Sequence, residues 1–331
     1  MPTSPPLSLR KIGKTGIAVT RLGLGGAPLG GLFESVPEEE AQATLKAAYA
    51  AGIRYFDTAP FYGHGTAEMR MGAFLRERPR DEFVLSTKVG RVLVPAAEAV
   101  EDRHYKDLLP LKPVFDFSAD GIRRSFDSSL ERLGLERIDI LLVHDPDEHY
   151  RAVLDEAFPA LARLRDEGVI RAIGAGMNQW EMLSDFARNA DFDCFLLAGR
   201  YTLLDQSALP KLLPACEKRG IAILLGGPYN SGVLAAGSRG AGYYNYERPE
   251  PSILEKVRRL EEVGARHGVP LKAAALQFPL AHPAVVTVVA GARTAAEAEE
   301  NARMFFHPIP SSFWSELRDE RLLPEEAPVP E

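Results

Sequence analysis

Cysteine and histidine are scarce in this sequence, and neither is arranged as a set of ligands. The two cysteines, Cys194 and Cys216, lie outside any Cys-x-x-Cys spacing, so a disulfide framework or a cysteine-based metal site is not expected. The 7 histidines are scattered, and no His-x-His or carboxylate cluster follows a strand-like run. We therefore predict two reduced cysteines that pack in the interior, and no bound metal.

Long basic tracts and long apolar runs are also missing. A net charge of −7 without a Lys/Arg block argues against binding to nucleic acid or to an anionic membrane. No apolar run approaches the roughly 18 residues that span a bilayer, and residues 1–9 lack the apolar core of a signal peptide. These absences predict a cytoplasmic protein whose partners are small molecules, and they leave homo-oligomerisation open.

What the sequence does contain is a regular alternation of short apolar runs with helical patterns, which is typical of βαβ units around a buried parallel sheet. Eight runs read as strands: Arg21–Gly25, Arg54–Ala59, Phe83–Val89, Ile138–His144, Ile170–Gly176, Cys194–Arg200, Ile221–Leu225 and Val285–Ala290. Helical segments between them have recognisable ends: a capping box at Ser35 with a stop at Gly52, a cap at Ser118 with a stop at Gly134, and the segments Leu154–Asp166 and Ile253–His267. Eight strands followed by helices predict a TIM-type (β/α)8 barrel, so we expect residues 1–331 to form a single domain.

Three connecting segments have predictable places in such a barrel. The segment Leu9–Thr20 precedes the first barrel strand and is expected to form a hairpin that plugs the barrel bottom. The connections Gly90–Phe117 and Gly226–Ser252 are long and leave the carboxyl ends of strands, where barrels build their active sites. They are therefore candidate substrate or cofactor loops.

A dinucleotide-binding motif of the Rossmann type is the competing interpretation of the glycine-rich segment Gly23–Pro28. Pro28 replaces the third glycine, and the next helix does not begin until about Val36, so the phosphate-binding turn is missing. The barrel remains the prediction.

Four polar residues stand at or just beyond the carboxyl ends of strand-like runs. Asp57 and Lys88 belong to the second and third runs, His144 ends the fourth, and Tyr62 follows shortly after Asp57. A buried lysine needs an acidic partner, so we expect a Lys88–Asp57 ion pair, and a cation beside the phenol should lower the pKa of Tyr62. Each residue alone is explained by a structural role, as a buried pair or a core histidine, but the four together favour an active site.

The motif Asp57-Thr58-Ala59-Pro60-Phe61-Tyr62-Gly63, followed by Glu68, Ser86-Thr87-Lys88 and Val143-His144, resembles the aldo-keto reductase superfamily, and the likeness continues in order to Glu300-Asn301. Val114-Phe115-Asp116-Phe117-Ser118 and Leu142-Val143-His144-Asp145-Pro146 resemble its branch of D-threo-aldose 1-dehydrogenases (L-fucose or galactose dehydrogenases) and pyridoxal 4-dehydrogenase. The resemblance implies that Tyr62 is the general acid/base, that Lys88 and Asp57 tune it, and that His144 orients the substrate oxygen.

The resemblance also implies an NAD or NADP cofactor. It places Gly291, Arg293, Glu297, Glu300 and Asn301 in the adenosine-binding segment, and Asn178 on the nicotinamide carboxamide. The chain departs from the family pattern at Met177, where many relatives have serine, at Ala198, where glutamine is common, and at Gly226, the usual position of a stacking tyrosine. Tyr229 is the residue we expect to replace that tyrosine.

Glu297 carries a prediction about cofactor choice. It stands where relatives often have Arg or Gln near the adenosine 2′ position, and a carboxylate there accepts hydrogen bonds from ribose hydroxyls but repels a 2′-phosphate. NAD is therefore expected to be preferred to NADP. Arg293 beside it could still hold a phosphate, and the alternative for Glu297 is an exposed acidic helix face.

The function that follows is NAD(P)-dependent oxidation of an aldose of the L-fucose, D-arabinose or D-galactose type at C1, giving the lactone. The alternatives are a pyridoxal 4-dehydrogenase, a general aldehyde or ketone reductase, and a non-catalytic, cofactor-binding regulatory subunit. The presence of all four catalytic residue types favours an enzyme.

Overall fold

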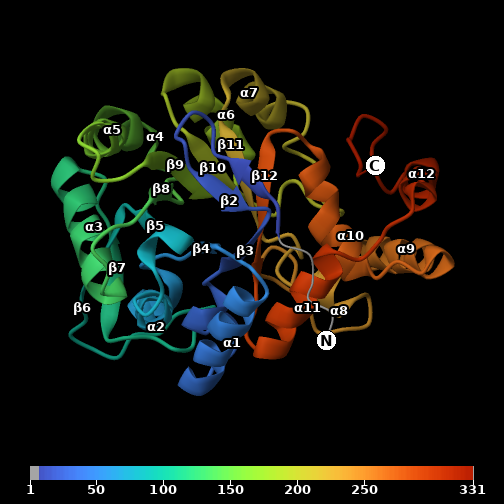
Figure 1. Ribbon diagram of the computed structural model, residues 1–331, viewed down its shortest axis with the longest axis horizontal. Coiled ribbons are helices and arrows are strands. Elements are labelled where there is room, and N and C mark those ends of the chain that lie inside the picture. Colours follow the sequence, from blue (N-terminus) through green and yellow to red (C-terminus); the bar gives the residue numbers. More distant parts are fainter. Residues whose placement is uncertain (1–6, 331) are drawn as a thin grey trace.

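The computed structural model describes residues 7–330, in which eight parallel strands close into a barrel in the order β10-β11-β12-β3-β4-β5-β8-β9. The barrel strands are β3 (Leu22–Gly25), β4 (Tyr55–Asp57), β5 (Val84–Val89), β8 (Ile140–His144), β9 (Ala172–Met177), β10 (Cys194–Ala198), β11 (Ala222–Gly226) and β12 (Val285–Gly291). All eight lie on the strand-like runs of the sequence, so the predicted (β/α)8 barrel is confirmed (Figure 1).

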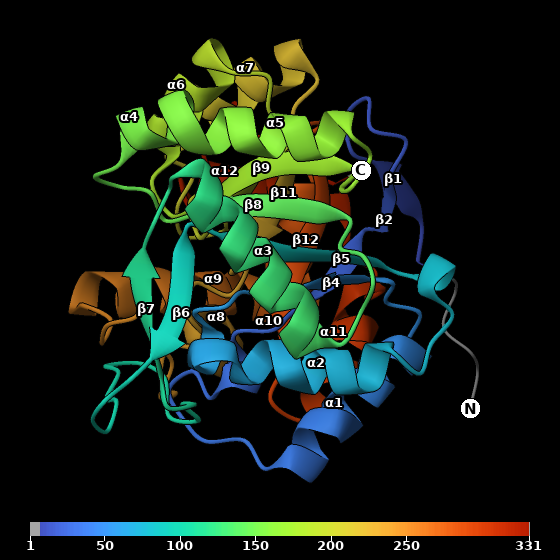
Figure 2. The same ribbon diagram turned by 90° about the vertical axis from the view of Figure 1, so that its left-hand side faces the viewer.

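Helices surround this barrel (Figures 1 and 2). The longer ones are α1 (Glu38–Ala50), α2 (Thr66–Leu75), α3 (Ala119–Leu133), α5 (Phe158–Asp166), α6 (Trp180–Asn189), α7 (Leu212–Arg219), α9 (Pro251–His267), α10 (Leu271–Gln277), α11 (Ala295–Phe305) and α12 (Ser311–Asp319). Short pieces complete the chain: α4 (Tyr150–Ala152), α8 (Val233–Ala236), the 3-10 turns η1 (Pro28–Gly30), η2 (Tyr62–Gly65), η3 (Arg80–Glu82) and η5 (Phe278–Ala281), and the π-helical turn η4 (Val153–Ala157). No helix within residues 7–330 is long and apolar enough to cross a membrane.

The predicted hairpin before the barrel is present. Strands β1 (Leu9–Lys11) and β2 (Ala18–Thr20) pair antiparallel. Ile12 and Ile17, in and beside the turn, are fully buried and belong to the same apolar cluster as Tyr55 and Ile140, which come from barrel strands. Apolar side chains of the hairpin therefore pack against the interior of the barrel, as the sequence predicted.

Helix ends test the sequence reasoning at single residues. Ser118 caps α3 as predicted, because its hydroxyl accepts a hydrogen bond from the backbone N–H of Gly121 at 3.1 Å. The capping box at Ser35 is wrong: Pro37 occupies the cap of α1, and the Ser35 hydroxyl donates to the carboxylate of Asp107, 72 residues away. The Ser35 hydroxyl, which the local pattern assigned to the helix cap, is therefore bound to a residue far away in the sequence.

Both long connections contain structure that the sequence did not indicate. The first holds a hairpin of β6 (Arg91–Pro95) and β7 (Leu111–Phe115), which stands outside the barrel (Figure 2), and the second holds α8. The two connections touch through an Arg103–Glu247 ion pair of 2.5 Å. The backbone N–H of Phe33, in the β3–α1 connection, donates to the carbonyl of His104 at 2.7 Å. Three loops thus meet over one end of the barrel.

Candidate active site

Four polar side chains come together at the carboxyl ends of three adjacent barrel strands. Asp57 is the last residue of β4, Lys88 lies near the end of β5, His144 is the last residue of β8, and Tyr62 opens η2 directly after β4. Strand β5 pairs with both β4 and β8, so the closure of the sheet brings the four within one small volume. The juxtaposition expected from the sequence is therefore present.

Lys88 and Asp57 form the buried ion pair that was predicted. The Lys88 ammonium lies 2.8 Å from Asp57 Oδ2 and also donates to the carbonyl of Thr58 at 2.9 Å. Ser86 donates to the other carboxylate oxygen at 2.7 Å. Lys88 is 1% exposed and Asp57 3%, so both charges are desolvated and depend on these partners.

The predicted effect of this pair on Tyr62 is wrong. The Lys88 ammonium does lie 4.7 Å from the centre of the Tyr62 ring. Burial nevertheless raises the pKa of Tyr62 well above 10, and the Asp57 carboxylate raises it further. Desolvation of the phenolate, together with an anion that already neutralises Lys88, outweighs the attraction to the cation. Tyr62 is therefore protonated near neutral pH.

His144 stands at a right angle to Tyr62. The two ring centroids are 5.8 Å apart with an interplanar angle of 84°. Burial, with Arg91 and Lys88 as neighbouring cations, holds the pKa of His144 well below 6.5, so the imidazole is neutral. A neutral imidazole can donate one hydrogen bond to a substrate oxygen and accept another at its second nitrogen. His144 Nδ1 is buried without a protein partner within residues 7–330.

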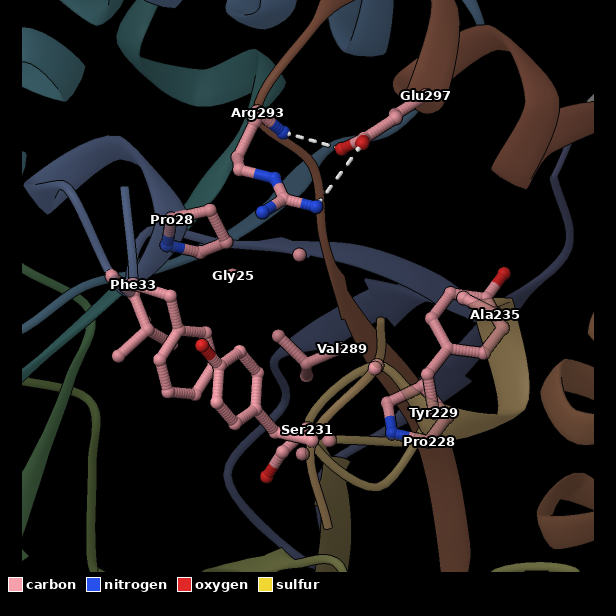
Figure 3. Close-up of a pocket in the computed structure, with 18 of the residues that line it drawn as sticks. Gly25, Pro28, Phe33, Pro228, Tyr229, Ser231, Ala235, Val289, Arg293 and Glu297 are labelled. Carbon is pink, nitrogen blue, oxygen red and sulfur yellow. Dashed lines mark hydrogen bonds and ion pairs between the residues drawn. The ribbon is translucent and has the colours of Figure 1, made fainter. Parts of the chain in front are cut away.

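A cavity of about 420 Å³ extends from Tyr62 to the start of α11. Figure 3 shows its walls around Phe33, Val289 and Glu297. Seven of the predicted site residues line it: Asp57, Tyr62, Gly291, Arg293, Glu297, Glu300 and Asn301. Lys88, His144 and Asn178 are not on its wall. Lys88 is bound to the wall residue Asp57, and the ring of His144 lies next to that of Tyr62. Asn178 donates a hydrogen bond of 3.1 Å to the carbonyl of Ala198, which lines the cavity.

Arg293 and Glu297 face each other at the far end of this cavity (Figure 3). Thr294 caps α11 by accepting from the backbone N–H of Glu297. Glu297 Oε2 accepts from the backbone N–H of Arg293 at 2.8 Å, and Oε1 lies 3.5 Å from its guanidinium. Glu34 forms a second ion pair with the same guanidinium. Two carboxylates therefore surround the Arg293 guanidinium, which could have held a 2′-phosphate.

Tyr229 does not occupy the position that we expected of it. Its hydroxyl donates to Asn301 Oδ1 at 2.7 Å, so the ring lies beside α11, on the opposite side of the cavity from Phe33 (Figure 3). The suggestion that it replaces the missing stacking tyrosine is therefore wrong. Lys272, which pairs with Glu300 at 2.5 Å, is a further polar residue of this end that the sequence did not single out.

Sequence reasoning also missed the aromatic residues that roof the cavity near Tyr62. Phe33 and Tyr243 stack with ring centroids 4.1 Å apart, and Tyr246 lines the same wall. The side-chain amide of Asn178 lies near the phenol of Tyr246, where it partly offsets the rise in the pKa of that phenol caused by burial. Asn245 and Tyr246 both have positive φ, 50° and 65°, inside a tight turn closed by hydrogen bonds between Tyr244 and Glu247. Asn245 and Tyr246 are neighbours in a polar loop, and their sequence did not predict this turn.

The cavity suits an extended dinucleotide. Its walls near Tyr62 are made of small residues, Gly25, Ala198 and Gly226, and a side-chain carbon added to Gly226 would lie 2.9 Å from Leu196 Cδ2. Such walls leave room for a flat ring. The amino end of α11 favours anionic or polar groups. The described residues contain no group of three or more side chains able to hold a metal ion.

Comparisons with known proteins agree with this geometry. The family model described as "Aldo/keto reductase family" matches residues 21–320. The chain is 44% identical over 318 residues to D-threo-aldose 1-dehydrogenase of a Pseudomonas species, with 93% of this chain and 96% of that protein covered. It is 42% identical over 334 residues to pyridoxal 4-dehydrogenase of Microbacterium luteolum, with 95% and 97% covered. A solved glycerol dehydrogenase from Gluconobacter oxydans, at 24% identity, superposes with a TM-score of 0.76 over 98% of this chain and 97% of its own, which shows the shared fold.

The barrel, the polar group at its mouth and the long cavity beside it define a class: NAD(P)-dependent oxidoreductases built on a TIM barrel. Within that class the chain belongs to the aldo/keto reductase family. Both parts of the predicted resemblance, the superfamily and its branch, are confirmed.

Proposed function

We propose that the protein oxidises an aldose at C1 to the corresponding lactone, with Tyr62 as the group that receives the hydroxyl proton after its phenol has lost its own proton. The observation that carries the proposal is the buried group of Tyr62, Lys88, Asp57 and His144 at the end of the cavity. The likeness to D-threo-aldose 1-dehydrogenase, 44% identical, supports the sugar as substrate. The proposal treats residues 1–331 as one catalytic domain, because the barrel strands extend from residue 22 to residue 291.

A nicotinamide cofactor bound in the cavity would supply the hydride acceptor for C1, and the residues of this chain would handle the proton. His144, neutral and 5.8 Å from Tyr62 between ring centres, donates a hydrogen bond to the C1 oxygen and holds it against the phenol. Lys88 and Asp57 keep the phenol in place and supply nearby charge. In the reverse direction, reduction of a carbonyl, the same phenol donates its proton.

The cofactor would lie along the cavity, with its nicotinamide near Tyr62 and its adenosine near α11. Arg293, Glu297, Glu300 and Asn301 would hold the adenosine end, and Asn178 would bind the carboxamide by exchanging its contact with Tyr246. We propose that NAD is preferred, because Glu297 meets the cofactor with a carboxylate and Arg293 is already paired with Glu34 and Glu297.

Substituting Tyr62 by Phe tests the central role. The variant keeps the ring and its packing but has no transferable proton, and general acid–base catalysis is typically worth about 10²–10⁴-fold. We expect kcat for aldose oxidation to fall by that factor while the Kd of NAD stays within about twofold of the wild-type value. A variant with near wild-type kcat would remove Tyr62 from the mechanism.

Cofactor choice has its own test. A tenfold lower KM for NAD than for NADP corresponds to about 1.4 kcal/mol, and the Glu297→Arg variant should narrow or invert this difference. Glu299→Arg, on the same helix, is the matched control and should leave the ratio unchanged. Equal KM values in the wild type would place cofactor choice elsewhere.

The relative that oxidises pyridoxal defines a second candidate function. Its 42% identity over most of both chains, together with the aromatic roof of Phe33, Tyr243 and Tyr246, is compatible with an aromatic aldehyde as substrate. Oxidation of L-fucose, D-arabinose, D-galactose and pyridoxal with each cofactor separates the two functions. A kcat/KM for pyridoxal at least tenfold above that of every aldose would favour the second.

A further inference from the structure

An ion pair that the proposed chemistry does not use lies directly beside His144. Arg91, the first residue of β6, donates to Asp145 Oδ2 at 2.8 Å, and the same oxygen lies 3.5 Å from His144 Nε2. Both residues are partly shielded, with side chains 15% and 27% exposed. Oδ2 carries both contacts, and within residues 7–330 no hydrogen bond reaches Oδ1. Arg91 Nε is also buried without a hydrogen-bond partner in the described part of the chain, so the pair is incompletely satisfied.

The backbone at Asp145 is held in an unusual conformation. Its φ is +39°, which is uncommon and strained for a residue other than glycine. Its N–H donates to the carbonyl of Gly176 at 3.0 Å, which anchors the turn to strand β9. Asp and Asn tolerate this region better than most residues. The turn directs the carboxylate towards Arg91 and His144 rather than out into solvent.

Arg91 is fixed as firmly as its partner. Its guanidinium lies over the ring of Phe61, 4.4 Å from the centroid, and over that of Phe115, 4.8 Å away. Two aromatic faces leave the planar fork few orientations, so its outer N–H groups are presented in a defined direction.

The pair lies close to the reacting phenol. Asp145 Oδ2 is 3.5 Å from His144 Nε2, and the ring centroid of His144 is 5.8 Å from that of Tyr62. Arg91 also contacts the ring of Phe61, the residue that precedes Tyr62 in the chain. A ligand whose oxygen lies between Tyr62 and His144 would extend its neighbouring atoms towards this carboxylate and guanidinium.

We propose that the Asp145–Arg91 pair binds secondary hydroxyl groups of a polyhydroxylated substrate whose reacting oxygen is held by Tyr62 and His144. The carboxylate accepts a hydrogen bond from one hydroxyl while the guanidinium donates to its neighbour, so a vicinal diol satisfies both partners at once. A ligand without hydroxyls should bind weakly, because it would bury the carboxylate and the guanidinium without supplying hydrogen-bond partners for them. This inference deepens the proposed function, on which it rests for the position of the reacting oxygen.

The test is a comparison of two six-carbon ligands, galactitol and 1,6-hexanediol, bound to the full-length protein saturated with oxidised cofactor. Affinities are measured by ligand-observed NMR, which reaches millimolar values. Loss of a hydrogen bond to a charged group typically corresponds to about tenfold or more in affinity. Asp145→Asn should therefore weaken galactitol at least tenfold and leave 1,6-hexanediol within twofold, and asparagine tolerates the left-handed backbone of this turn.

Asp147→Asn, an exposed acid two residues away in the same loop, is the matched control and should change neither affinity. Arg91→Gln is the second variant and should weaken galactitol selectively as well. An equal loss for both ligands would indicate a purely structural pair, and no loss would exclude contact with hydroxyls; either result overturns the inference.

The outcome of this binding test can be distinguished from the outcome of the test of aldose oxidation. Selective loss of galactitol binding in a protein that oxidises no aldose would retain this site and refute the sugar oxidation. Aldose oxidation with an unchanged KM in Asp145→Asn would retain the proposed function and refute this site.

Discussion

The buried ion pair of Lys88 and Asp57 makes a quantitative prediction about stability. At 2.8 Å and an effective dielectric constant of about 20, two unit charges attract by about 6 kcal/mol. Removing one partner from a buried pair leaves an uncompensated charge and typically costs about 3–5 kcal/mol. We expect Lys88→Met and Asp57→Asn each to lower the free energy of unfolding by that amount. The double variant removes both charges. Its loss of unfolding free energy should be smaller than the sum of the two single losses by at least about 2 kcal/mol.

Urea unfolding followed by circular dichroism measures all four proteins of this cycle. Typical stabilities of about 5–15 kcal/mol leave each single variant folded at low temperature. Ser86 and Thr58 still contact the remaining partner in each variant, which keeps the loss finite. If each single variant loses less than about 1 kcal/mol of unfolding free energy, and the two losses add in the double variant, the two charges are not coupled. Desolvation would then not make Lys88 and Asp57 depend on each other.

Three further predictions concern the pH response and the packing. Because burial and Asp57 raise the pKa of Tyr62, log kcat/KM for aldose oxidation should rise with pH between 7 and about 10. Asp57→Asn should shift this rise to lower pH, and Lys88→Met should shift it to higher pH. A pH profile that is flat above pH 7 would contradict this prediction. The pKa of His144 is depressed in the folded state, so below about 6.5 the unfolded chain binds the extra proton and stability falls as pH falls, by at most about 1.4 kcal/mol per pH unit; thermal unfolding between pH 7 and 5 should show a smaller slope in His144→Gln. Gly72→Ala should destabilise the protein by roughly 1–3 kcal/mol, because the added carbon would lie 2.1 Å from the Leu133 carbonyl where α2 meets α3, whereas an ordinary helical glycine would gain about 1 kcal/mol from alanine.

The barrel could be predicted from the sequence because its strands are specified locally. Each strand is a short apolar run bounded by polar or turn residues, and the parallel order follows from the helices between them. The same locality placed Asp57, Lys88 and His144 correctly, since a residue at the carboxyl end of a barrel strand reaches the mouth whatever the loops do. The hairpin of β6 and β7 escaped detection because Pro95 and Pro113 interrupt its apolar pattern.

What depended on distant partners could not be predicted. The pKa of Tyr62 is raised by enclosure that includes Tyr246, which is brought in by a loop far along the chain. The Ser35 hydroxyl bonds to Asp107 instead of capping its helix, and the Tyr229 hydroxyl donates to Asn301. In each case the sequence identified the chemical group, and the tertiary structure chose its partner.

The charge state of the resting site bears on how it accommodates a substrate. Tyr62 and His144 are both neutral, because burial raises the pKa of the phenol and lowers that of the imidazole. Lys88 and Asp57 cancel each other within 2.8 Å. A neutral hydroxyl or carbonyl oxygen therefore enters a site with no net charge to displace, and both rings can donate hydrogen bonds to it at once. In the proposed mechanism, reduction would start directly from this state, since Tyr62 already carries the proton, whereas oxidation would first require that proton to leave. The same four residues would then serve both directions, and the pH at which each becomes fast would depend on how strongly Asp57 and the enclosing aromatic rings disfavour the phenolate.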